Sequence, residues 1–279
     1  MLPRMEELPR GLCHYTSGKG FLGIVDSKAL WATHVLYLND HSEYQLAFRS
    51  ARSLLDQMSI LRELSAQAPR LRKAFLDVKP IIRGRAPAIF VTSFSEEWDD
   101  LSQWRGYTPP GDGYALVFDP EPLKIRALRE GWRLEKCLYG RDGQRALIKI
   151  LQTFFEYYLS TGHDSEERAQ REIDDLARDL FAIAPVVKDE SFRSEAEWRL
   201  ISPPINDMAE DTIKFRGGSS FLVPYVDFAY QIPDHRSIMH VNVGPGPNAD
   251  LALQAVSTLI VQKGLRCGCG PARSPYRPW

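Results

Sequence analysis

Helix-like and strand-like segments do not alternate regularly along this chain, and that pattern most limits the folds open to it. Apolar residues at helical spacing occur early and in the middle, whereas strand-like runs gather in the last third, with no repeat of about 20 to 50 residues. A parallel sheet with crossover helices needs regular alternation of the two. The sequence therefore predicts an α+β fold with mainly antiparallel strands.

Capping and turn residues bound the expected elements. We expect the strand 88–93 to pair with the strand 113–118. Expected strands are 12–16, 29–32, 88–93, 113–118, 132–138, 195–201, 212–215, 221–226 and 239–243, and expected helices are 20–27, two stretches over about 40–80, 146–160, 166–183 and 248–262. The segment 142–183 is expected to be a helical insertion.

The 279 residues, 44% apolar and 25% charged, are typical of a globular protein, and we expect one domain over 1–279. A net charge of -1 gives no global attraction to nucleic acid or an anionic membrane, although a local basic groove remains open. No apolar run approaches the roughly 20 residues of a membrane span, and the charged start is unlike a signal peptide. The expectation is a cytoplasmic protein without a membrane partner.

Four cysteines are too few and too scattered for a disulfide scaffold, so we expect free thiols. Cys267-Gly268-Cys269 lacks a second cluster at ligand spacing. A glycine-rich turn is the simpler interpretation, and no metal is expected.

Glu195-Ala196-Glu197 begins an expected strand with alternating polar and apolar residues. With a period of two, Glu195, Glu197 and Arg199 share one face, and Trp198 and Leu200 point to the core. Two carboxylates on one surface indicate a candidate catalytic pair. The alternative is an exposed strand face with a Glu-Arg pairing.

Two further polar groups end apolar strands. Ser93 and Ser95 could orient a carboxylate, or else begin a turn or cap a helix. His14, with Tyr15 and Thr16, could accept a flat, amide-bearing ring, although a lone histidine is more often a satisfied polar residue.

These motifs carry a resemblance to a bacterial family of uncharacterised proteins with the elements His-Tyr, Leu-Trp-Ala, Asn-Asp-x-x-Glu and Pro-Tyr-Arg. That family is more distantly similar to the ADP-ribosyltransferase superfamily, whose split sheets bind NAD in a cleft. In this chain the elements are His14-Tyr15, Leu30-Trp31-Ala32, Asn39-Asp40-His41-Ser42-Glu43 and Pro275-Tyr276-Arg277. Asn39-Asp40 with Glu43 is best explained as a helix cap, and the alternative is a polar cluster at the cleft rim.

The resemblance implies an ADP-ribosyltransferase-like fold with NAD as co-substrate, and it implies a role for each matching residue. The second carboxylate of the Glu-x-Glu motif would be catalytic and the first would activate the acceptor. The implied site residues are Glu197 and Glu195 for catalysis, and His14, Tyr15, Thr16, Ser93, Ser95, Trp104 and Tyr107 for binding NAD. His14 would bond the ribose, the Tyr15 backbone would hold the nicotinamide amide, and Trp104 or Tyr107 would stack on nicotinamide. The chain departs from His-Gly-Thr members by having Tyr15 in place of glycine.

The chemistry suits these residue types, because a carboxylate stabilises the oxocarbenium-like sugar formed when nicotinamide leaves. The leading hypothesis is ADP-ribose transfer to a protein or nucleic-acid acceptor, with a toxin or antiphage role as an extension. The alternatives are an NAD glycohydrolase and a non-catalytic nucleotide or nucleic-acid binding module. Lys188 and Arg193 could face the NAD diphosphate or an acidic target, or lie on a solvated surface.

Overall fold

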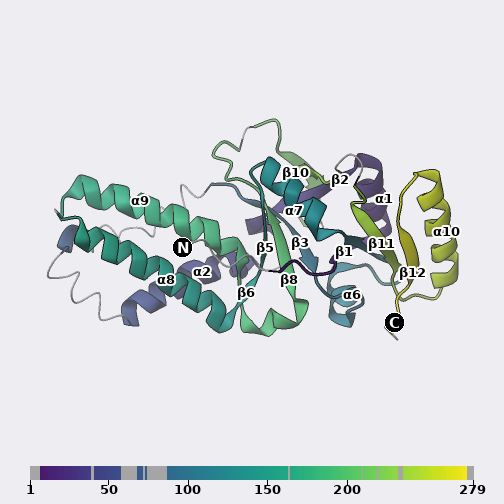
Figure 1. The fold of residues 1–279 in the computed structure, drawn as a ribbon, viewed down its shortest axis with the longest axis horizontal. Coiled ribbons are helices and arrows are strands. Elements are labelled where there is room, and N and C mark those ends of the chain that lie inside the picture. Colours follow the sequence, from purple (N-terminus) through teal and green to yellow (C-terminus); the bar gives the residue numbers. More distant parts are fainter. Residues whose placement is uncertain are drawn as a thin grey trace.

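The computed structural model describes residues 7–38, 41–57, 68–71, 73, 87–162, 164–208, 210–218, 220–231 and 235–274. It is an α+β structure in which a ten-stranded sheet carries helices and continues into a group of three long helices (Figure 1). The predicted fold class is thus confirmed at this level. Among the residues described, no helix is both long and apolar enough to span a bilayer.

The sheet is antiparallel except where β12 pairs with β11. Its main path runs β12-β11-β4-β1-β3-β2-β10-β9, and β8 and β5 branch from β3. The strands are β1 (Leu12–Ser17), β2 (Ala29–His34), β3 (Phe90–Ser95), β4 (Gly113–Phe118), β5 (Arg133–Lys136), β8 (Glu197–Ile201), β9 (Lys214–Gly217), β10 (Leu222–Ala229), β11 (Ile238–Val243) and β12 (Gly268–Pro271).

Strand β1 holds the two halves of the sheet together. It pairs with β4 along its whole length, from Leu12↔Phe118 to Ser17↔Gly113, but with β3 through Cys13↔Ser95 alone. The predicted pairing of 88–93 with 113–118 is wrong, because β1 lies between β3 and β4. Beyond Cys13, the edge of β1 that faces β3 is left without a strand partner among the described residues.

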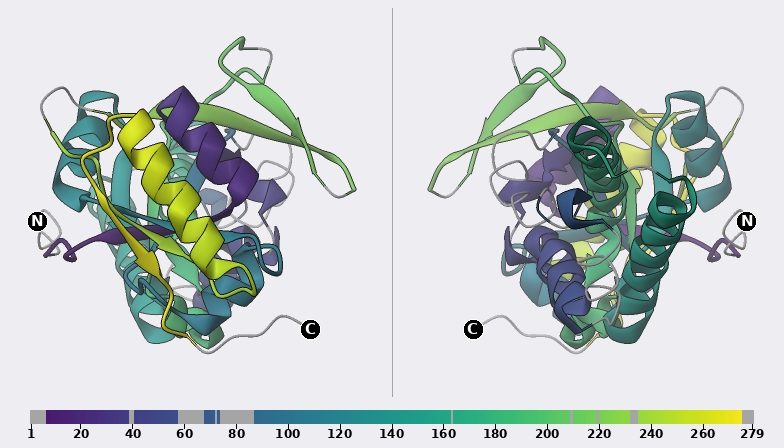
Figure 2. Two further views of the ribbon diagram at one scale, coloured as in Figure 1. Left: turned by 90° about the vertical axis from the view of Figure 1, so that its right-hand side faces the viewer. Right: turned by 90° about the vertical axis from the view of Figure 1, so that its left-hand side faces the viewer.

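Four helices accompany the sheet: α1 (Gly18–Ser27), α6 (Leu101–Tyr107), α7 (Pro120–Arg129) and α10 (Ala249–Gln262). Figure 2 shows α1 and α10 side by side, where Lys263 pairs with Asp26. The seven residues of α6 are too few to show a helical period. Helix α7 was not among the expected helices, although Asp119 as N-cap before Pro120 is a sequence signal for its start.

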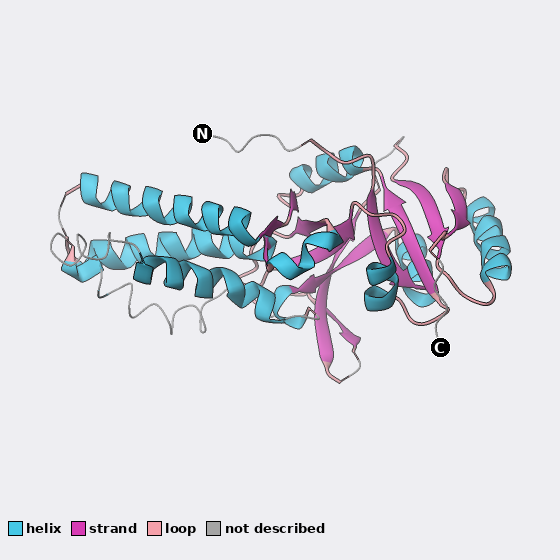
Figure 3. Cartoon of the chain, turned by 90° about the horizontal axis from the view of Figure 1, so that it is seen from below, coloured by secondary structure: helices cyan, strands magenta, loops and turns pink. Residues whose placement is uncertain are grey.

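The helical lobe consists of α2 (His41–Gln57), α8 (Gly140–Ser160) and α9 (Glu166–Ile183), and it extends away from the sheet (Figure 3). These helices confirm the expected segments from about 40 and over 142–183. The two-stranded parallel sheet of β6 (Leu138–Tyr139) and β7 (Val187–Lys188) joins the start of α8 to the chain that follows α9. The expected helix towards residue 80, the cap at Asn39-Asp40 and the 275–277 motif lie outside the described residues.

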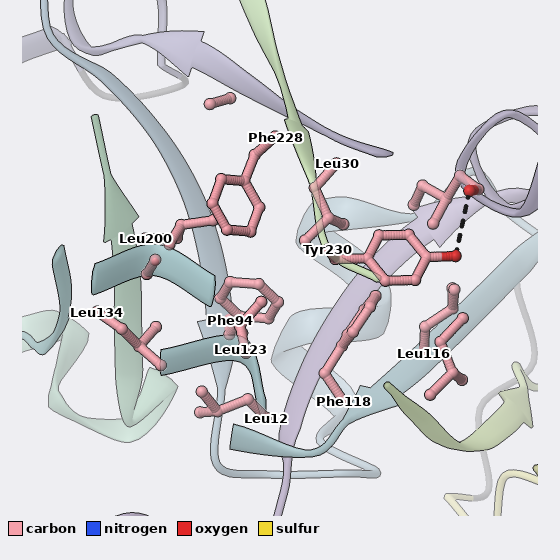
Figure 4. Close-up of a cluster of buried hydrophobic side chains, with 14 of the residues drawn as sticks. Leu12, Leu30, Phe94, Leu116, Phe118, Leu123, Leu134, Leu200, Phe228 and Tyr230 are labelled. Carbon is pink, nitrogen blue, oxygen red and sulfur yellow. Dashed lines mark hydrogen bonds between the residues drawn. The ribbon is translucent and has the colours of Figure 1, made fainter. Parts of the chain in front are cut away.

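Two apolar clusters stabilise the structure. The sheet cluster includes Phe94, Phe118, Phe228 and Tyr230, all 2% exposed or less (Figure 4). The lobe cluster is completed by two sheet residues: its members include Leu147, Leu151, Phe155, Ile173, Leu176, Val91 and Ile201. The lobe therefore packs directly on β3 and β8, which positions its ends beside the first residues of β8.

The predicted glycine-rich turn at Cys267-Gly268-Cys269 is wrong, because Gly268 to Pro271 pair with β11 as β12. Backbone pairing needs no side chains, so glycine did not prevent it. All four cysteines are free thiols, as expected. The described residues contain no group of three or more His, Cys, Asp or Glu that could hold a metal ion.

Candidate functional site

A cavity of about 690 Å³ opens where β1 ceases to pair with β3. Residues from β1, β2, β3, β8 and β9 line it, together with the first turn of α1 and Lys188 of β7. Its size is that of a pocket for a small ligand or cofactor. Most of the residues proposed from the sequence line it, namely His14, Tyr15, Thr16, Ser93, Tyr107 and Glu197.

His14 on β1 reaches across the opening to β3. Its Nδ1 donates to the backbone oxygen of Ser93 over 2.9 Å, because a carbonyl can only accept. Burial lowers the pKa of His14, and the bond to Ser93 opposes that effect only in part. The imidazole is therefore neutral at pH 7, with Nε2 as an acceptor for a ligand hydroxyl.

Tyr15 and Thr16 continue the β1 wall. The Tyr15 ring is buried against Trp104, and its hydroxyl donates to Glu97 O over 2.8 Å. This leaves the backbone of Tyr15 as the part suited to a ligand, in line with the sequence expectation. Thr16 lies so near α1 that a Cβ on Gly20 would be 2.0 Å from its Oγ1, which explains the glycine there.

The two serines of β3 do different things. Ser93 lines the cavity, whereas Ser95 is buried. Ser95 Oγ donates to the backbone oxygen of Glu195 over 2.7 Å and accepts from the N–H of Glu97 over 3.0 Å. Ser95 therefore holds the backbone at residue 195 and also begins a turn, which matches the second sequence interpretation; the group that it holds at residue 195 is a backbone carbonyl and not a carboxylate.

Glu197, the first residue of β8, is 4% exposed, and each of its carboxylate oxygens contacts a cation. Its Oε1 accepts from Arg199 Nε over 2.7 Å, and its Oε2 accepts from Lys188 Nζ over 2.6 Å and from Arg199 over 3.2 Å. Burial raises the pKa of Glu197, but the charges and hydrogen bonds of Arg199 and Lys188 outweigh it and lower the pKa to about 2. The alternative of an exposed Glu-Arg face is wrong, since both residues are buried.

Glu195 does not lie on β8, so the predicted shared strand face is wrong for Glu195 and holds for Glu197 and Arg199. It ends the 3₁₀ helix η3 (Glu190–Glu195), and Ala196 follows in the left-handed region at φ 43°. A non-glycine residue there costs about 1–3 kcal/mol and commonly marks a functional site. Lys188 nevertheless brings the carboxylates together, with Nζ 2.5 Å from Glu195 Oε2, and Tyr107 donates to Glu195 Oε1 over 3.1 Å.

Both ends of the helical lobe meet this carboxylate pair, which the sequence did not predict. The Glu197 N–H donates to the Tyr139 hydroxyl over 2.8 Å, and Arg199 donates to Pro185 O over 2.7 Å. Tyr139 pairs with Lys188 across β6 and β7. Lys188 is 2% exposed rather than on a solvated surface, and the apolar run before it was the only available signal.

The expectation for Trp104 is wrong, because Trp104 is 1% exposed, packs on Tyr15 and donates from Nε1 to Asp99 over 2.7 Å, so it cannot stack on a ligand in the cavity. Arg193 does not line the cavity. It lies on the solvated surface, as the second alternative has it, and pairs with Glu190 over 2.5 Å. Tyr107 is the proposed aromatic that remains, partly exposed at the cavity wall.

Residues 103–200 match the model of a family described as a protein of unknown function (DUF2971). No curated protein and no solved structure matches the chain. The matched segment runs from α6 to β8 and includes Tyr107, Lys188, Glu195, Glu197 and Arg199. The match supports the predicted likeness to an uncharacterised family. The description of that family names no activity, so the likeness to ADP-ribosyltransferases remains a hypothesis.

Proposed function

We propose that the chain is an NAD-dependent ADP-ribosyltransferase that breaks the bond between nicotinamide and ribose and transfers ADP-ribose to a macromolecular acceptor. The observation that carries the proposal is one cavity lined by both His14 of β1 and the ionised carboxylate of Glu197 of β8. The resemblance assigns these two residues to the ribose and to catalysis. Their meeting at one cavity is what that mechanism requires.

The proposed likeness to a split-sheet fold rests on one feature of the ten-stranded sheet, the opening between β1 and β3. Pairing between β1 and β3 stops after Cys13↔Ser95, and the cavity lies at that opening. Backbone groups on the open edge of β1 are free of the sheet ladder and can bond a ligand amide. Such an edge suits nicotinamide, with Tyr107 at the wall as a stacking surface.

The charge state of Glu197 suits the bond-breaking step. Cleavage releases neutral nicotinamide and leaves positive charge on the ribose. With a pKa of about 2, Glu197 is ionised at every physiological pH, so it stabilises charge and is too weak a base to remove protons. One acceptor position of Oε1 remains beside the bond to Arg199, and a ribose hydroxyl can fill it.

Glu195 suits the second step, the attack of the acceptor on the ribose carbon. The acceptor's hydroxyl or amine forms the new bond and gives its proton to a carboxylate. Glu195 is bridged to Glu197 by Lys188 and reached by Tyr107. The Glu195 side chain is more exposed than that of Glu197, 13% against 6%, which supports Glu195, rather than Glu197, as the proton acceptor.

NAD hydrolysis is a second candidate, favoured by a small side pocket of about 60 Å³. Its lining includes Gln103, Tyr107, Glu195 and Glu197. A space of this size with several polar partners is large enough for one or two water molecules. Water held there would compete with a macromolecular acceptor.

The test is nicotinamide release from NAD by the purified protein, with and without cell lysate as acceptor source. We expect release from the wild type and a loss of about 100- to 1000-fold in Glu197→Gln. Dependence on lysate selects transfer, and free ADP-ribose without labelled acceptor selects hydrolysis. Circular dichroism shows that each variant is folded, and His14→Ala tests the ribose contact independently. No release from folded wild type in either condition contradicts the proposal.

A further inference from the structure

The charges that line the cavity do not balance. Among the described lining residues, the cations are Lys19, Lys188, Arg199 and Arg216. Lys188 and Arg199 are matched by Glu195 and Glu197, with which they form ion pairs. Lys19 and Arg216 have no carboxylate partner in the described part of the chain. The cavity therefore keeps a surplus of two positive charges.

Arg216 is held in the cavity wall by neutral groups. It lies on β9, and one terminal nitrogen donates to Thr33 Oγ1 over 3.0 Å. The guanidinium carbon lies 5.8 Å from the centre of the Trp31 ring, which also lines the cavity. The Nε atom is buried and has no hydrogen-bond partner among the described residues. An unsatisfied buried donor is unfavourable, and on a cation it is more so.

The pKa of Arg216 reflects its place in the cavity wall. Burial lowers it from its ordinary value, and Tyr225 opposes that change only in part. Arginine stays charged in proteins, so the lowered pKa reflects a guanidinium that has lost part of its hydration. A bound anion would supply a counter-charge.

We propose that Arg216, together with Lys19, forms a binding site for the diphosphate of a dinucleotide. A diphosphate diester carries two negative charges, which matches the surplus in the cavity. Guanidinium binds phosphate through paired, charge-assisted hydrogen bonds, and an ammonium adds a point charge. The inference that the ligand is an anion rests on the charges of the cavity. The inference that this anion is the diphosphate of NAD rests on the proposed function.

The neighbouring lysine of β9 provides a matched control. Lys214 lies two residues from Arg216, is exposed, pairs with Asp227 over 2.5 Å and does not line the cavity. Arg216→Met and Lys214→Met each remove one positive charge from the same strand. A general effect of net charge moves both variants equally, whereas a diphosphate site responds to Arg216 alone.

The experiment is calorimetric titration of the full chain with ADP-ribose and with inorganic pyrophosphate, neither of which requires turnover. We expect Arg216→Met to weaken ADP-ribose binding by about 10- to 100-fold and Lys214→Met by less than about threefold. Thermal unfolding of each variant shows that it is folded.

Equal binding of ADP-ribose by wild type and Arg216→Met overturns the site, as does a wild type that binds neither probe. A dependence on Arg216 seen with a single-stranded oligonucleotide but not with ADP-ribose also overturns it. Arg216-dependent binding without nicotinamide release upholds the site and contradicts the proposed function instead.

Discussion

The cavity contains two groups of charged side chains that are built in opposite ways. Lys188, Glu195, Glu197 and Arg199 form a closed cluster in which each carboxylate has a cation within 2.7 Å. Arg216 has a hydroxyl and an aromatic ring for neighbours. The closed cluster is complete without a ligand, whereas the wall at Arg216 is not.

The difference separates the two tasks of a site. A carboxylate that must stabilise charge in a transition state is most effective when its geometry is fixed beforehand, and three hydrogen bonds fix Glu197. A group that must bind a charged ligand is most effective when nothing else neutralises it. Each feature can be broken separately, with effects that we rank by size.

Breaking the closed cluster should have the largest effect on stability. Lys188→Met removes the cation that pairs with the half-buried Glu195 and leaves the buried Glu197 with Arg199, so we expect a loss of about 3–5 kcal/mol in the free energy of unfolding. Urea denaturation measures it. Lys136→Met, which removes a partly exposed cation 2.7 Å from Glu96, is the control and should lose no more than about 1 kcal/mol. Equal losses in the two variants would show that the buried cluster contributes no more to stability than a partly exposed ion pair.

Lowering the pH should open the same cluster without mutation. The folded-state pKa of Glu197 is about 2, below its ordinary value of 4.5, so ionised Glu197 adds stability that is present above pH 4.5 and lost as pH falls towards 2. The shift corresponds to roughly 3 kcal/mol. Unfolding free energies of wild type and Glu197→Gln, measured from pH 6 to pH 2, should therefore converge at low pH. Parallel curves would contradict the lowered pKa.

The sequence predicted the β1 side of the cavity better than the carboxylate side. His14 to Thr16 lie on a strand whose limits follow from local pattern, and the structure brings them to the cavity as expected. Glu195 failed the same logic, because the turn at Ala196 breaks the period of two. Alanine in a left-handed conformation has no local sequence signal.

The contacts of Lys188 and Tyr139 with Glu197 were missed for another reason. These contacts depend on where the chain enters α8 and where it leaves α9. The pairing of β6 with β7 fixes both points. Trp104 was misjudged because an aromatic after a candidate motif gives no sign of whether tertiary packing buries it. Local sequence pattern thus predicted the helices and strands. The cluster of Lys188, Glu195, Glu197 and Arg199 could be recognised only from the tertiary fold.

A smaller effect should follow from loosening the lobe's contact with the cluster. Tyr139→Phe removes the hydroxyl that accepts the buried N–H of Glu197 and leaves that donor unsatisfied. We expect a loss of about 1–3 kcal/mol in unfolding free energy, by urea denaturation. Tyr157→Phe, an exposed tyrosine on α8, is the control and should be within about 0.5 kcal/mol of wild type. A neutral Tyr139→Phe would mean that the lobe does not support Glu197.

The smallest effect on stability should come from replacing Arg216 in the cavity wall. For this variant the informative result is whether the free energy of unfolding falls or rises. Arg216 is half-buried, and its buried Nε has no hydrogen-bond partner among the described residues. Replacing it by an apolar side chain of similar length removes a desolvation cost and loses one bond to Thr33. These terms oppose each other, so Arg216→Met should unfold within about 0.5 kcal/mol of wild type, or at a slightly higher temperature. The same substitution is expected to weaken diphosphate binding strongly. A clear destabilisation, by contrast, would mean that Arg216 supports the fold through contacts of its own. A variant that is no less stable yet no longer binds would show that this arginine is kept for a ligand.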